Sequence, residues 1–103
     1  MSFPATQQGW YQVSNRDRTQ QDQFYVSGPF LVSVISTNGT LQFPHPDSGQ
    51  MVTIERRACF DPSVEIRARS IVTDVATNEA FIVVFVREWQ GFTEAYLVSQ
   101  RAS

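Results

Sequence analysis

Lysine is absent from this chain, and all eight of its basic side chains are arginine. Lysine is among the commonest residues of globular proteins. Its hydrated ammonium keeps protein surfaces apart, whereas the flat guanidinium of arginine pairs with carboxylates or phosphates and stacks on aromatic rings. Protein interfaces are depleted in lysine and enriched in arginine and aromatic residues. Chance or codon bias is the first explanation for the missing lysines, and a contact-forming surface is the second.

Charge of either sign is scarce. Charged residues make up 17% of the 103 residues, and the net charge is -2. A weakly charged surface is a weak barrier to self-association. A strong non-specific nucleic-acid binder usually has a basic excess, so the overall balance disfavours that class but leaves room for a local arginine stripe. The length predicts one domain, which we place at residues 9–103 behind a flexible arm at residues 1–8.

Cysteine and histidine occur once each, as Cys59 and His45. One cysteine excludes a disulfide within these residues, and zinc sites use several Cys or His ligands at recognisable spacing. We therefore expect no metal site and, without a glycine-rich phosphate loop, no cofactor. A base formed by His45 with Asp47, or a Cys59–His45 nucleophile pair, would lack the remaining catalytic groups. We expect an exposed turn histidine, a buried thiol and a protein that is not an enzyme.

Long apolar segments are also missing. The longest apolar run, Phe81–Val86, is far shorter than the roughly 20 residues of a membrane helix. The first residues have neither the basic nor the apolar region of a signal peptide. We expect no secretion signal and no membrane partner, and a cytoplasmic or virion-associated location.

The periodicity that is present has a period of two and is filled by β-branched and aromatic residues, which predicts strands. We expect an all-β domain of about seven or eight mostly antiparallel strands, as a small barrel or a two-sheet sandwich. Gly28-Pro29 predicts an edge, a bulge or a corner. The nearly continuous apolar run at 81–88 predicts a central strand covered on both faces, and Trp89–Phe92 predicts an aromatic turn.

Two hairpins are predicted from turn residues and apolar matching. Asn38-Gly39 favours a type I′ turn joining strands 30–37 and 40–43, with Val34 opposite Phe43. In that register the core face would consist of Phe30, Val32, Val34, Leu41 and Phe43. The segments 51–58 and 63–75 are expected to pair around 59–62, with Ile54 opposite Ile66. That register would place glutamates and arginines of both strands in one ladder on the opposite face.

The function we infer is a non-enzymatic β-module for protein–protein interaction or homo-oligomeric assembly, with a viral or phage-like origin as one hypothesis. Aromatic residues and arginine are the usual binding hot spots. The expected contact residues are Trp10, Tyr11, Trp89, Phe92, Arg67 and Arg69.

Two other functions remain open. The first is a single-stranded nucleic-acid-binding barrel, in which arginines flank aromatic stacking platforms. Its contacts would be Arg56, Arg57, Arg67 and Arg69. The second is a small ligand-binding or catalytic barrel, which would need His45, Asp61 or Glu65 to point inward.

Overall fold

The computed structural model describes residues 6–16, 24–37, 39 and 41–100, and these residues form eight β-strands. The strands are β1 (Thr6–Arg16), β2 (Phe24–Ser36), β3 (Gln42–Pro44), β4 (Met51–Thr53), β5 (Arg56–Phe60), β6 (Ile71–Asp74), β7 (Glu79–Trp89) and β8 (Phe92–Ser99). The described residues contain no helix that could cross a membrane. The predicted all-β class is confirmed.

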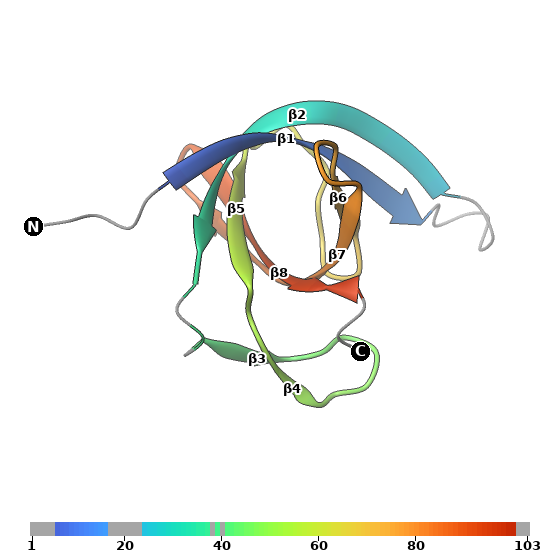
Figure 1. Ribbon diagram of the computed structural model, residues 1–103, viewed down its shortest axis with the longest axis vertical. Coiled ribbons are helices and arrows are strands. Elements are labelled where there is room, and N and C mark those ends of the chain that lie inside the picture. Colours follow the sequence, from blue (N-terminus) through green and yellow to red (C-terminus); the bar gives the residue numbers. More distant parts are fainter. Residues whose placement is uncertain (1–5, 17–23, 38, 40, 101–103) are drawn as a thin grey trace, which may run out of the picture.

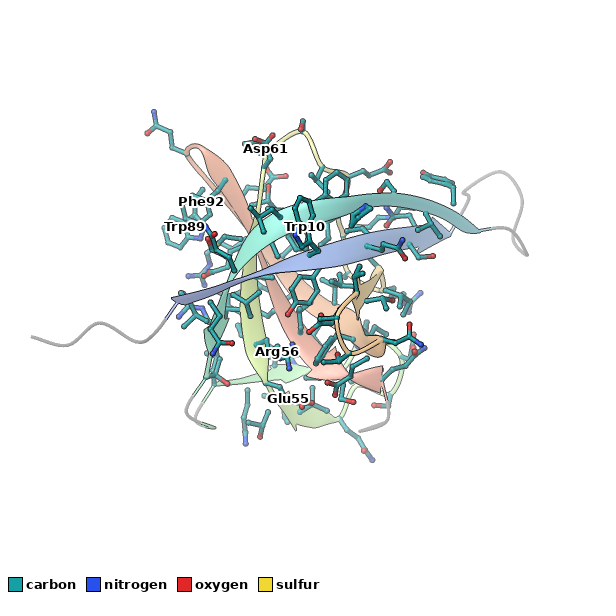
Figure 2. All side chains as sticks on the ribbon, turned by 45° about the horizontal axis from the view of Figure 1, so that its top comes forward. Trp10, Glu55, Arg56, Asp61, Trp89 and Phe92 are labelled. Atoms are coloured by element: carbon teal, nitrogen blue, oxygen red, sulfur yellow. The ribbon has the colours of Figure 1, made fainter. Side chains whose placement is uncertain are left out.

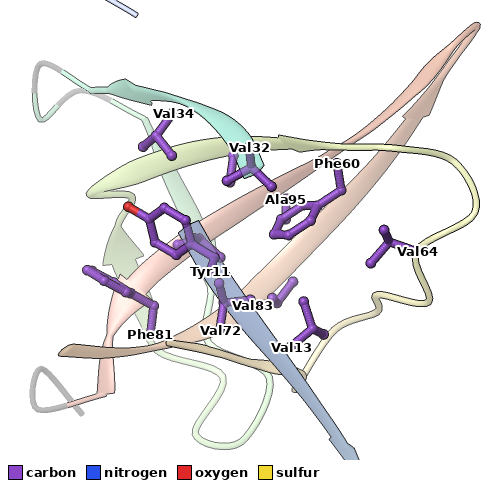
Figure 3. Close-up of a cluster of buried hydrophobic side chains, with 12 residues drawn as sticks. Tyr11, Val13, Val32, Val34, Phe60, Val64, Val72, Phe81, Val83 and Ala95 are labelled. Atoms are coloured by element: carbon purple, nitrogen blue, oxygen red, sulfur yellow. The ribbon is translucent and has the colours of Figure 1, made fainter. Parts of the chain in front are cut away.

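Six of the strands close into an antiparallel barrel in the order β1-β2-β5-β8-β7-β6, which decides for a barrel over a sandwich (Figure 1). β3 and β4 form a separate two-stranded sheet. Side chains alternate between the interior and the exterior along barrel strands. The interior is filled by apolar side chains from every barrel strand and from Val64 in the β5–β6 connection (Figure 3).

The β3–β4 sheet covers the outside of β7 and β8. Phe43 of β3 stacks on Phe85 of β7 at a centroid distance of 4.9 Å and on Tyr96 of β8 at 5.1 Å. Ile82 and Val84 of β7 are buried in this second apolar cluster, while Phe81 and Val83 are buried in the barrel. The prediction of a central strand covered on both faces is confirmed for residues 81–84, which explains why these positions are apolar in succession, whereas Phe85, Arg87 and Glu88 are exposed.

β1 and β2 form the longest ribbon of the molecule. The first strand is longer than its sequence pattern indicates, because residues 6–8 of the expected arm belong to β1, while residues 1–5 lie outside the described residues. Gly28 and Pro29 together oppose Gln12 where the β1–β2 register shifts, so the predicted bulge is present. The φ of Gly28 is +98°, and a Cβ there would lie 3.0 Å from Phe30.

The predicted hairpin of strands 30–37 and 40–43 is wrong. Asn38 and Thr40 lie outside the described residues, but β2 pairs with β1 and β5, whereas β3 pairs with β4. Residues 33–35 of β2 already have a neighbour on both edges, so no edge remains for β3 at these positions. Phe43 is half-buried against the outside of the barrel instead of sharing the core face with Val34.

The second predicted hairpin is also wrong. β5 pairs with β2 and β8, and β6 pairs with β1 and β7. Asp61 accepts hydrogen bonds from the backbone and the hydroxyl of Ser63, and this turn directs the chain away from β5. Residues 61–70 form turns, and the expected glutamate–arginine ladder does not form.

Polar networks lie at the two ends of the barrel. At one end, Arg56 points inward, and its Nη1 donates to the Tyr11 hydroxyl at 2.9 Å and to Asp74 at 3.3 Å. At the other end, the buried Asn15 amide donates to the backbone oxygen of Glu65 at 2.9 Å and accepts from the Ser70 hydroxyl. Together with the apolar filling, these contacts leave the barrel as a packed core.

Candidate contact surface

Exposed apolar side chains form one row across the outside of the barrel, which we call the apolar row. Trp10 pairs with Leu31, and Trp89 pairs with Phe92. Val75 follows β6, and its backbone N–H donates to the Trp10 oxygen at 3.0 Å. Asp61 directly follows β5, where continuation of the β2–β5 register by two residues would set it opposite Leu31 and continuation of the β5–β8 register by one residue would set it opposite Phe92. The row is therefore Val75, Trp10, Leu31, Phe92 and Trp89, interrupted by Asp61.

Each member of the apolar row is a large side chain turned to solvent. The exposed fractions are 47% for Val75, 53% for Trp10, 52% for Leu31, 37% for Phe92 and 47% for Trp89. Trp10 lies on the ribbon, and the other two aromatic members lie at the tip of the β7–β8 hairpin (Figure 2). Asp61 keeps its charge within the row, because hydrogen bonds from Ser63 lower its pKa.

The aromatic tip is held in place by a buried carboxylate. Glu94 projects from the outer face of β8 yet is only 3% exposed. It accepts hydrogen bonds from Arg57 at 2.6 Å, from the Tyr96 hydroxyl at 2.5 Å and from the Trp89 indole at 3.3 Å. Burial alone would raise the pKa of Glu94, but these hydrogen bonds outweigh it and lower the pKa. The ionised carboxylate therefore fixes the Trp89 ring, which stacks on Phe92 at 6.2 Å.

The ribbon beside the row carries no charge over most of its length. Residues 6–15 and 24–36 contain no Asp, Glu, Lys or Arg. On its outer face Val26 is 60% exposed, and Tyr25 on the other face is 45% exposed. A surface of this kind has little electrostatic opposition to a neighbouring protein surface.

Tyr11, which the sequence suggested as a contact residue beside Trp10, lies in the barrel interior and is 3% exposed. Adjacent residues of a strand face opposite sides, so the exposure of Trp10 requires the burial of Tyr11. Burial also raises the pKa of the Tyr11 hydroxyl. Tyr11 is therefore not part of the exposed surface.

The four arginines of the expected stripe do not line up on adjacent strands. Arg56 points into the barrel, and Arg57 pairs with Glu94 on its outside. Arg67 and Arg69 lie in the β5–β6 connection, where Arg67 pairs with Glu65 and Arg69 pairs with Asp47 at 3.3 Å.

Each stripe arginine therefore has a carboxylate partner. Arg69 also donates to the Pro46 oxygen at 3.0 Å. Arg67 lines a shallow open pocket that the sequence did not predict; its walls are Ile66, Arg67, Ala68, Phe85, Val86 and Glu88.

His45 and Cys59 do not come together as a catalytic pair. His45 is 7% exposed, which corrects the expected exposed histidine, and its Nδ1 accepts the backbone N–H of Asp47 at 3.1 Å. Cys59 is half-buried on the outer face of β5, opposite Glu94. Burial and the Glu94 charge raise the pKa of the Cys59 thiol, which is opposite to the activation of a nucleophilic cysteine.

Acidic side chains are likewise scattered. Asp61 and Glu65 are exposed and do not point into the barrel. Among residues 6–16, 24–37, 39 and 41–100, no group of three or more His, Cys, Asp or Glu side chains could hold a metal ion.

Comparison of the chain with family models, curated proteins and solved structures finds no match. The surface must therefore be interpreted from its own geometry and chemistry.

Proposed function

We propose that this protein is an assembly module that associates with further copies of itself through the apolar row and the adjoining uncharged face of the β1–β2 ribbon. The observation that carries this proposal is the row itself, in which five large apolar side chains from different parts of the barrel share one surface. Large exposed apolar patches, especially those bordered by polar residues, mark interaction sites. Its members include two tryptophans, the residue type most enriched among binding hot spots.

The order of the aromatic tip supports the same function. A side chain that is already fixed loses little conformational entropy on binding, so more of its contact energy appears as affinity. Trp89 is fixed on three sides, because it is hydrogen-bonded to Glu94, stacked on Phe92 and covered by the guanidinium of Arg87 at 5.4 Å. Such a tip is suited to insertion into a complementary surface.

The arginine contacts favour assembly over the nucleic-acid alternative. A phosphate-binding stripe needs guanidinium groups that are available to phosphate. Arg57, on the outside of the barrel, is engaged by the buried Glu94 carboxylate at 2.6 Å. Arg56 is turned away from the outer surface and lies over the Phe81 ring at 4.5 Å.

The test is the solution mass measured by light scattering over a concentration series at low and high salt. The wild-type protein is expected to form a defined oligomer that persists at high salt, because apolar contacts are not screened by ions. The double variant Trp10→Ser/Leu31→Ser should weaken association by at least about 30-fold, which corresponds to the loss of one hot spot.

Met51→Ser is the matched control, because Met51 is 61% exposed but lies on β4 outside the row. Its mass distribution should equal that of the wild type. A wild-type protein that stays at the 11.7 kDa monomer mass at every concentration would remove self-assembly as its function.

A further inference from the structure

The β1–β2 ribbon has two stretches in which the backbone has a neighbour on one side only. β6 pairs with β1 at residues 11–14 and reaches Trp10 through Val75, so Thr6–Gly9 have only β2 beside them among the described residues. Within the part of the chain that the structure describes, β5 pairs with β2 only at residues 33–36, so Phe24–Ser27 have only β1 beside them there. We call these stretches the β1 edge (Thr6–Gly9) and the β2 edge (Phe24–Ser27).

One hydrogen bond shows which backbone groups are open. The N–H and C=O of one residue in a strand point to the same side, and successive residues alternate. The Trp10 oxygen accepts from Val75, on the side away from β2. The backbone groups of Gln8 and Thr6 therefore also point away from β2 and are open on the β1 edge.

The same alternation applies to β2. Ser14 pairs with Val26 and Arg16 with Phe24, and both even-numbered β1 residues point away from β2. Ser14–Val26 and Arg16–Phe24 are therefore the non-hydrogen-bonded pairs of the β1–β2 ladder. In such pairs the backbone groups of both residues point away from the partner strand, so the N–H and C=O groups of Val26 and Phe24 point away from β1. The β2 edge thus has two residues with open donors and acceptors, as the β1 edge does.

Neither edge has the features that usually prevent strand addition. Exposed edges are commonly protected by charged side chains, especially lysine, or by proline. The β1 edge reads Thr-Gln-Gln-Gly and the β2 edge Phe-Tyr-Val-Ser, without a charge or a proline. The bulge at Gly28-Pro29 begins directly after the β2 edge and limits strand addition to residues before it.

We propose that the β1 edge of one copy pairs with the β2 edge of a second copy as an antiparallel strand addition. The two edges have equal length, and they lie on opposite sides of the ribbon at its opposite ends, with the start of β1 on the left and the start of β2 on the right in Figure 1. Placing Thr6 opposite Val26 and Gln8 opposite Phe24 joins all open groups in four main-chain hydrogen bonds. The partner is a second copy of this protein, because each chain carries both a β1 edge and a β2 edge.

The pairing fixes the type of assembly and rests on the self-association proposed above. Each copy has one β1 edge and one β2 edge, so the contact is head-to-tail and leads to a closed ring or an open filament. Pairing of β2 edge with β2 edge would give a two-fold dimer but would leave every β1 edge open. The head-to-tail arrangement uses both edges of every copy.

Two proline variants test the joint. Val26→Pro removes a donor from the β2 edge, and Gln8→Pro removes one from the β1 edge, while the hydrogen bonds between β1 and β2 remain. Each variant alone lacks one half of the joint and should be monomeric by light scattering. An equimolar mixture should form dimers, because the intact β2 edge of Gln8→Pro can accept the intact β1 edge of Val26→Pro. Val26→Thr and Gln8→Thr are the matched controls and should assemble like the wild type.

A covalent test does not depend on proline. In the proposed register Gln7 lies opposite Tyr25 of the next copy, in the close pair between two hydrogen-bonded pairs. The variant Gln7→Cys/Tyr25→Cys with Cys59→Ser should give a ladder of covalent oligomers on oxidation, and the variants with only one new cysteine should stop at dimers.

The outcomes separate the two proposals. If both proline variants still assemble and the oxidised cysteine variant gives no ladder of oligomers, strand addition is overturned. The apolar row then remains as the interface. A Gln8→Pro dimer combined with a Val26→Pro monomer would replace the head-to-tail joint by pairing of two β2 edges. A wild-type protein that is monomeric at every concentration would overturn both proposals.

Discussion

Trp89 and Glu94 are joined by a hydrogen bond of 3.3 Å from the indole Nε1 to the carboxylate Oε1, although Trp89 is 47% exposed and Glu94 only 3%. The exposed Trp89 ring therefore covers the Glu94 carboxylate to which it is hydrogen-bonded. Arg57 supplies the opposite charge at 2.6 Å. A buried carboxylate with a charged partner and two neutral donors is a stable arrangement only while every group stays in place.

Replacement of this carboxylate by its amide tests that dependence. Glu94→Gln keeps the size of the side chain but leaves Arg57 without its counter-charge and presents an amide N–H₂ to some of the donors. We expect the free energy of unfolding to fall by about 1.5–3 kcal/mol, the range for a hydrogen bond to a charged group. Urea denaturation measures the loss. Glu88→Gln, at an exposed position of β7, is the control and should change it by less than about 0.5 kcal/mol.

The same residue predicts a pH dependence. Because the pKa of Glu94 is lower in the folded protein than its ordinary value of 4.5, the folded state binds fewer protons than the unfolded state as the pH falls through this range. The stabilisation is therefore fully present above pH 4.5 and is lost as the pH falls through the folded pKa. The difference in unfolding free energy between wild type and Glu94→Gln should be largest near neutral pH and shrink in acid. A constant difference across this range would contradict the assignment.

The alternation in the sequence predicts side-chain faces better than strand partners. Val32 and Val34 were expected on the core face and are 3% and 6% exposed in the barrel. The partner strand was wrong because closure of a barrel joins segments that are distant in the chain. A local turn signal such as Asn38-Gly39 contains no information about the pairing of β2 with β5, which the closed ring requires.

Part of the contact surface could be predicted in the same way. Trp10, Trp89 and Phe92 are exposed as expected of contact residues, but their position in one row depends on registers that connect five separate segments. Glu94 was missed, although the sequence places this charge two residues from Phe92 and two from Tyr96, on the same strand face. A carboxylate between two aromatic residues of one face indicates a hydrogen-bonded group.

The inward-facing Arg56 leads to a third prediction. Arg56→Met keeps an apolar chain over the Phe81 ring but leaves the Asp74 carboxylate and the Tyr11 hydroxyl without their shared donor. The Arg56 and Asp74 side chains are 28% and 13% exposed, so solvent compensates in part. We expect a loss of about 1–3 kcal/mol in the free energy of unfolding.

A double-mutant cycle with Asp74→Asn isolates this pair. If the ion pair stabilises the barrel end, the two losses should overlap by at least about 0.5 kcal/mol. Arg87→Met is the control, because its guanidinium stacks on the exposed Trp89 and should contribute about 0.5 kcal/mol. Strictly additive losses at positions 56 and 74 would show that the barrel end does not depend on their contact.

The β3–β4 sheet should fold together with the barrel, because its aromatic contact is with β7 and β8. Phe43→Ala removes a ring that stacks on both Phe85 and Tyr96 and opens the second apolar cluster to water. We expect a loss of about 2–4 kcal/mol, somewhat below the cost of truncating a fully buried phenylalanine, and a single cooperative unfolding transition by urea denaturation. Met51→Ala, on the exposed side of the same sheet, should change the stability by less than about 0.5 kcal/mol. If Phe43→Ala were as neutral as the control, the sheet would contribute nothing to the barrel, and Ile82 and Val84 would have to be protected from water by another segment.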